Sequence, residues 1–199
     1  PVVDSIGRLV GRITVDDVMD EVREQAERDY QLASGLSQDV ETDDSVLRQT
    51  SARLPWLLIG MLGGIGNSMI LGNFDTTFAA HPEMALYIPL IGGTGGNVGT
   101  QSSALVVQGL ANSSLDANNT WKQILKESVV ALINATIISM LVYIYNFVRF
   151  GPTATVSYSV SLSLFAVVMF ASIFGTLVPM TLEKLKIDPA IATGPFISI

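Results

Sequence analysis

The chain has 199 residues, a formal net charge of −7 and a mean hydropathy of +0.46, and only 15% of its residues are charged. No segment has a surplus of basic residues, so nucleic-acid binding has no electrostatic signature here. The chain has no cysteine and a single histidine, which excludes disulfides, thiolate metal sites, cysteine nucleophiles and a zinc site built on histidines within it.

The first fifty residues predict a short α/β segment followed by a helix. Residues 2–3 and 8–15 have the β-branched and alternating pattern of two strands, with turn residues between them. Asp16 or Asp17 is expected to cap a helix over about residues 18–32. Residues 1–50 hold twelve Asp or Glu and five Arg, so this segment is acidic and faces water.

Four long uncharged stretches follow, and each is long enough to cross a bilayer. A helix needs about 20 apolar residues to cross roughly 30 Å of hydrocarbon. The predicted spans are residues 54–71, 84–110, 128–148 and 156–182, and residues 189–199 would begin a fifth. The predicted fold is an all-α polytopic membrane domain of five transmembrane helices, the fifth truncated, preceded by a small α/β remnant and an acidic connecting helix. We expect the chain to be part of a longer protein, because Pro1 opens directly into a folded pattern.

The short loops predict the orientation of these spans. If residues 1–53 are cytoplasmic, six basic residues flank the inner side and only Arg149 lies in an outer loop. The inner set is Arg48, Arg53, Lys122, Lys126, Lys184 and Lys186. This asymmetry satisfies the positive-inside rule and predicts a multi-pass protein of the plasma or inner membrane with its N-terminal side in the cytoplasm.

The strongest motif lies in the second predicted span, from Pro89 to Gln101. It contains five glycines and four polar side chains at membrane depth, which should weaken a helix and expose its carbonyls. A phosphate-binding loop would require a lysine and a preceding strand, and both are missing. Close helix packing explains the glycines but not Asn97 and Gln101 together.

We therefore favour a pore lining, because polar groups inside a membrane are costly unless they are used. The candidate lining residues are Gly92, Gly93, Gly95, Gly96, Asn97 and Gln101. The predicted second, third and fourth spans contain no carboxylate, and Glu127 and Glu183 are expected only at helix ends.

This stretch resembles the second membrane helix of the MgtE family of magnesium transporters, which has a similar Pro…Gly-Gly-Asn-x-Gly-x-Gln pattern. Residues 7–17 resemble the end of a cystathionine-β-synthase-type (CBS) regulatory domain, and the acidic helix resembles the plug helix of the family. Asp188-Pro189-Ala190 resembles the start of the fifth helix. The resemblance covers essentially the whole chain and divides it into a CBS remnant at 1–17, a plug helix and linker at 18–50, and a transmembrane domain at 51–199.

The resemblance implies a homodimer with a central pore that imports magnesium and is gated by cytoplasmic magnesium, with manganese or cobalt as further cations. In the family, magnesium held by acids of the regulatory domain and plug helix keeps the pore shut, and Asp17, Asp20 and Asp29 match this pattern. The alternative is a solvated helix face. A hard divalent cation would relieve the mutual repulsion of so many acids.

Two smaller signals leave alternatives open. Thr14 and Asp17 resemble the edge of a CBS domain that binds adenine nucleotides, but Thr14 is also suited to bind a local backbone group. Asp188 is an acid at the mouth of the fifth span and a pore candidate, although Asp before Pro at a helix start is ordinary capping. The family's pore aspartate is expected beyond Ile199.

Other function classes fit the sequence less well. An intramembrane enzyme would need paired carboxylates, a Ser/Lys dyad or His ligands, and the spans offer none. A secondary transporter of another divalent cation or of a small solute is the alternative function, since such proteins also use broken helices. A purely regulatory membrane anchor would not need Asn97 or Gln101.

Overall fold

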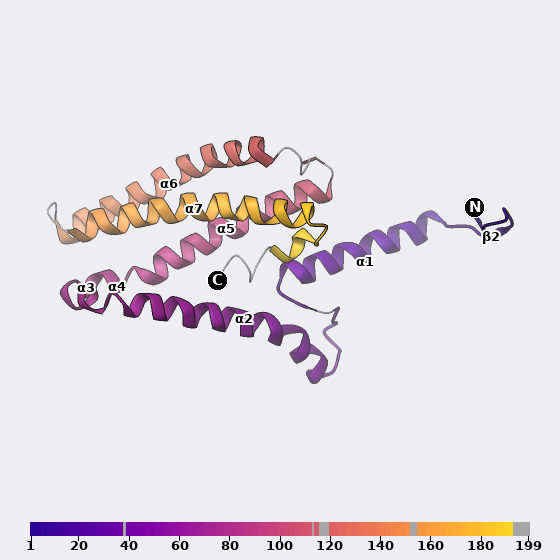
Figure 1. The fold of residues 1–199 in the computed structure, drawn as a ribbon, viewed down its shortest axis with the longest axis horizontal. Helices are drawn as coiled ribbons and strands as arrows, with labels where there is room; N and C mark the ends of the chain where they lie inside the picture. Colours follow the sequence, from indigo (N-terminus) through magenta and orange to yellow (C-terminus); the bar gives the residue numbers. More distant parts are fainter. Residues whose placement is uncertain (38, 113, 116–119, 152–154, 193–199) are drawn as a thin grey trace.

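The computed structural model describes residues 1–37, 39–112, 114–115, 120–151 and 155–192. The N-terminal residues form an antiparallel pair of short strands, β1 (Val2–Val3) and β2 (Leu9–Gly11), with a bulge in the register. Seven α-helices and a short 3-10 helix follow in the described ranges (Figure 1). They are α1 (Val15–Ala33), α2 (Val46–Gly72), α3 (Asp75–Ala80), α4 (Pro82–Ala85), α5 (Ile88–Ala111), α6 (Thr120–Phe150), α7 (Thr155–Lys184) and η2 (Pro189–Ala192).

Helix α1 begins three residues earlier than predicted, because Thr14 and not Asp16 or Asp17 is the N-cap. The Thr14 hydroxyl accepts the backbone N–H of Asp17 at 3.2 Å, and the Asp17 carboxylate accepts the backbone N–H of Thr14 at 2.7 Å. This reciprocal pair is a capping box. At the other end Gly35 has a φ of +81°, and Gly35 and Leu36 donate backbone N–H groups to the last turn of α1, which closes the helix.

The linker between α1 and α2 is tied to both helices by hydrogen bonds. The Gln31 side chain of α1 donates to the carbonyl of Val40 at 3.1 Å and accepts the N–H of Val40 at 3.2 Å. The backbone N–H and the hydroxyl of Ser37 both donate to the carbonyl of Ala52 in α2, at 2.9 Å each. Pro55 lies inside α2 and has no N–H to donate to the helix. This loosens α2 in the turn before Pro55, where Ser37 binds the Ala52 carbonyl.

Helices α5, α6 and α7 form the packed part of the chain, and α7 contacts both of the others along much of its length. Figure 1 shows α2 running apart from these three, and α2 makes no extensive contact with any other described helix. Helix α1 projects away from the bundle with the strand pair at its far end, while its C-terminal end meets η2 (Figure 1).

Small residues make the interfaces of α7 with its two neighbours. The buried positions recur every three or four residues, which is the spacing of one helix face. On α5 they include Gly95, Gly99, Ser102 and Gly109, and on α7 they include Ser157, Ser161, Ser172 and Gly175. The backbones approach closely at Gly175, where an added Cβ would lie 2.5 Å from the carbonyl oxygen of Gly99.

Three described helices are long and apolar enough to cross a membrane: α2, α6 and α7. They contain the first, third and fourth predicted spans. Helix α5 contains most of the second span, but its glycines and polar side chains keep it out of that set. Helix η2 covers the start of the predicted fifth span, and residues 193–199 lie outside the described residues. A helical membrane domain is therefore present, and the count of five spans stays a prediction.

Candidate functional site

Helix α5 has two faces of different character. Gly92, Gly93, Asn97 and Gln101 are exposed, whereas Gly95 and its neighbours on the α7 side are buried. Asn97 and Gln101 are four residues apart and therefore lie one above the other on the helix surface. No other described side chain is hydrogen bonded to either amide, so both are available to something outside this chain's own packing.

The prediction that the glycines open the helix is wrong, because Ile88–Ala111 is one continuous α-helix. The carbonyls of this segment serve the helical hydrogen bonds rather than a ligand. The Asn97 face instead offers amide side chains and, at Gly93, open space in which an added Cβ would meet nothing within 4 Å.

The structure divides the four candidate glycines of α5 between the two faces. A Cβ added at Gly95 would lie 2.7 Å from Cγ1 of Val167 in α7. The packing explanation therefore applies to Gly95, which lies away from the Asn97 face. Gly96 is half-buried between the two faces. Gly93 lies four residues before Asn97 on the face assigned to a pore, whereas Gly92 is exposed but lies about 140° around the helix from Asn97, on the side of Gly99.

Asp188 caps η2 in this structure. Its Oδ1 accepts the backbone N–H of Ala190 at 2.9 Å, and the side chain is exposed at the start of the segment. This is the local role that the Asp-Pro pair predicts. No hydrogen bond in the described residues links Asp188 to the amides of Asn97 and Gln101.

The three acids predicted to bind magnesium do not converge on one another. Asp17 and Asp29 are twelve residues apart, which is about 18 Å along the helix, and at about 3.6 residues per turn Asp20 and Asp29 lie on opposite faces. Within the described residues, no group of three or more His, Cys, Asp or Glu side chains is placed to hold a metal ion. Each acid would have to meet ligands from elsewhere.

Asp17 has a local partner of its own. Hydrogen bonds from the hydroxyl and the backbone N–H of Thr14 hold the pKa of Asp17 below its ordinary value. The same bonds give Thr14 the local role that was the alternative to nucleotide binding. Nucleotide binding by Thr14 and Asp17 stays a prediction.

Glu127 is the centre of a polar cluster that was not predicted from the sequence. This residue was expected at a helix end, but α6 begins at Thr120 and places Glu127 two turns inside, nine-tenths buried. Ser102 of α5 donates to Glu127 Oε1 at 2.7 Å, and Ser172 of α7 donates to the same oxygen. The two serine hydroxyl oxygens are 3.0 Å apart, so one carboxylate joins three helices.

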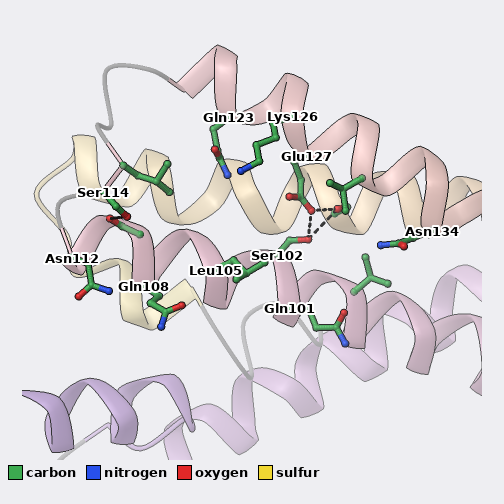
Figure 2. A pocket seen from close by; sticks show the side chains of 15 residues that line it. Gln101, Ser102, Leu105, Gln108, Asn112, Ser114, Gln123, Lys126, Glu127 and Asn134 are labelled. Carbon is green, nitrogen blue, oxygen red and sulfur yellow. Dashed lines mark hydrogen bonds between the residues drawn. The ribbon is translucent and has the colours of Figure 1, made fainter.

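A cavity of about 510 Å³ adjoins this cluster between α5 and α6. Figure 2 shows Glu127 of α6 beside Ser102 of α5, with Gln101 and Gln108 elsewhere on the α5 wall. Gln123, Lys126 and Asn134 of α6 also line it. A signal for this cavity was in the sequence, since the polar Gln123, Lys126 and Glu127 directly precede a predicted span and α6 continues through them.

Long apolar helices that bury a carboxylate and present amides at membrane depth define the chain as part of a polytopic helical membrane protein. The sequence profile of the MgtE family, described as divalent cation transporters, matches residues 88–199, which is more than half of the chain. The chain therefore belongs to the MgtE family, as its second membrane helix predicted.

Three relatives, each named magnesium transporter MgtE, are similar to the chain over its whole length. The protein of Thermus thermophilus is 34% identical over 204 residues, that of Bacillus subtilis 32% over 198, and that of Enterococcus faecalis 31% over 198. The chain spans 44%, 44% and 43% of these relatives, respectively, which is less than half of their length.

Proposed function

We propose that the protein containing this chain is a magnesium channel or transporter that imports divalent cations across the cell membrane. The observation that carries the proposal is the exposed Asn97 and Gln101 face of α5, in a chain of the MgtE family. Amide oxygens are hard ligands that can bind Mg²⁺ directly or accept hydrogen bonds from its bound waters. The naming of three relatives as magnesium transporters supports magnesium as the cargo.

The proposal includes a homodimer with five spans per subunit. Among the described residues the Asn97 face is left uncovered and α2 has no extensive partner, although α2 is apolar along most of its length. A polar helix face cannot stay open to hydrocarbon without cost. A second copy that brings its own α5 against this face would enclose a polar pore and bury part of α2.

The proposal also includes gating by cytoplasmic magnesium through α1. The C-terminal end of this acidic helix meets η2 at the edge of the bundle, on the side that the positive-inside rule assigns to the cytoplasm. Ions that bridge Asp17, Asp20 and Asp29 to upstream acids only in the closed form would shift the gating equilibrium toward that form.

The experiment that tests transport uses the full-length protein in liposomes loaded with a magnesium-sensitive dye. Asn97→Leu should lower magnesium uptake by about tenfold or more, because an apolar group removes an oxygen from the path. Thr136→Val is the matched control, since the Thr136 hydroxyl binds only the Leu132 carbonyl of its own helix at 2.7 Å. The control should take up magnesium as the parent does.

Normal uptake in Asn97→Leu would contradict the assignment of the α5 face to the pore. The parent protein could instead take up manganese, cobalt or a small solute but no magnesium. That result would favour a transporter with another substrate.

A further inference from the structure

The cavity beside Glu127 contains a buried carboxylate without a basic partner. No Lys, Arg or His among the described residues lies within ion-pair distance of Glu127, although Lys126 lines the same cavity. A buried charge is costly unless it is paired or coordinates a metal ion. The two serines that contact Glu127 are neutral, so the charge itself is not balanced.

The hydrogen bonds around Glu127 are those of an acceptor. Each serine hydroxyl has one hydrogen, and Ser102 and Ser172 both use theirs on Glu127 Oε1. No described residue donates to Oε2. The serine oxygens keep their lone pairs, and together with the carboxylate they form a group of oxygens from three helices that can accept a cation or the waters around it.

The remaining polar walls of the cavity suit a hydrated ion. Gln101, Gln108, Gln123 and Asn134 offer amide oxygens and N–H groups, which bind water through either end. Glu127 is the one carboxylate among the described lining residues, and a single carboxylate cannot strip an ion of all its waters. Mg²⁺ holds its waters tightly and is commonly bound by one or two carboxylates with several waters retained. Six waters occupy about 180 Å³ at about 30 Å³ each, which the cavity of about 510 Å³ accommodates.

We propose that this cavity binds one hydrated divalent cation per protomer, with Glu127 as the charged ligand and the amides as hydrogen-bond partners of its waters. The choice of a divalent ion rests on the proposed function, whereas the site rests on the geometry. The site is distinct from the Asn97 face, and Gln101 is common to both because it lies on that face and lines the cavity. An ion leaving the α5 face on the side predicted to be cytoplasmic would meet Glu127 next.

The test is Mn²⁺ binding to the purified full-length protein in detergent, followed by electron paramagnetic resonance and competed with Mg²⁺. Glu127→Gln preserves the shape and an oxygen for both serines but removes the charge. It should weaken one Mn²⁺ site per chain by about tenfold or more. Lys126→Gln removes a positive charge from the same wall and should tighten that site several-fold. Glu83→Gln, in the predicted outer loop, is the matched control and should leave the titration unchanged.

The opposite effects of Glu127→Gln and Lys126→Gln distinguish ion binding from a structural role, since loss of packing would not tighten binding in either variant. Gln108→Cys gives a second readout. Bound Mg²⁺ should slow the reaction of the new thiol with a thiol reagent when Glu127 is present, and it should not slow that reaction in the Glu127→Gln background. Unchanged Mn²⁺ affinity in both charge variants, or protection at Gln108→Cys that persists in Glu127→Gln, would overturn the proposal. If Glu127→Gln does not fold, an unchanged Mn²⁺ affinity in Lys126→Gln is sufficient by itself to overturn the proposal. A parent protein that binds Mn²⁺ here but carries no magnesium would contradict the proposed function and leave this site standing.

Discussion

Replacing Gly175 by alanine tests the packing that holds α5 against α7. The new Cβ would lie 2.5 Å from the oxygen and 3.2 Å from the carbonyl carbon and Cα of Gly99. Ordinary contacts of carbon atoms are about 3.5–4.0 Å, so the two helices must separate by about 1 Å at this point. The obstacle is backbone rather than a flexible side chain, and it cannot rotate away.

The cost follows from these distances. Overpacking in a well-packed interior costs typically about 1–3 kcal/mol, and a clash with backbone belongs at the upper end of that range. Alanine in place of a helical glycine returns about 1 kcal/mol. We therefore expect Gly175→Ala to lower the free energy of unfolding by about 2 kcal/mol, which is roughly a thirtyfold change in the ratio of folded to unfolded protein.

The assay is reversible unfolding in mixed micelles with increasing SDS, followed by the helical circular dichroism signal of the full-length protein. Gly64→Ala in α2 is the matched control, because an added Cβ there meets nothing within 4 Å. The control should be as stable as the parent or slightly more stable. A Gly175→Ala protein that unfolds at the same SDS concentration as the control would refute the close approach of α5 and α7.

Two further predictions concern the residue Lys186 after α7 and the acids of α1. Lys186 has a φ of +59° beyond the end of α7, so Lys186→Gly should raise the free energy of unfolding by about 1 kcal/mol in the same assay, whereas Lys186→Ala should not; equal stability of the two variants would contradict this reasoning. Neutralising Asp17, Asp20 and Asp29 together to Asn should raise the cytoplasmic magnesium concentration that half-inhibits uptake by about tenfold, equal to about 1.4 kcal/mol of lost preference for the closed state. An inhibition curve that does not move would mean that these acids are only a solvated face.

The long uncharged stretches predicted the cores of the helices well, but not their ends. A charge was taken as the limit of a span, yet α6 runs through Lys126 and Glu127, and both side chains line a cavity. The start of α1 was predictable in principle, since Thr14 and Asp17 have the spacing of a capping box.

The site was predictable only in part. The exposed positions of Asn97 and Gln101 follow from their four-residue spacing on one helix. The Glu127 cluster does not follow from any local pattern, because Ser172 is 45 residues away and joins it only through the packing of α7. The same packing explains why the glycine-rich α5 stays helical, since small residues there allow close contact with α7 that compensates for weak helix propensity.

The braced linker between α1 and α2 has a mechanical consequence. A flexible linker would let the acidic helix α1 change its position without affecting the membrane domain. Here both ends of the Gln31 side-chain amide are hydrogen bonded to the backbone of Val40. Ser37 donates two hydrogen bonds to the Ala52 carbonyl, shortly before Pro55. The linker therefore connects α1 to α2 by fixed contacts rather than by a free chain. A change in the orientation of α1 would act on α2 near Ala52, at the start of the predicted first span.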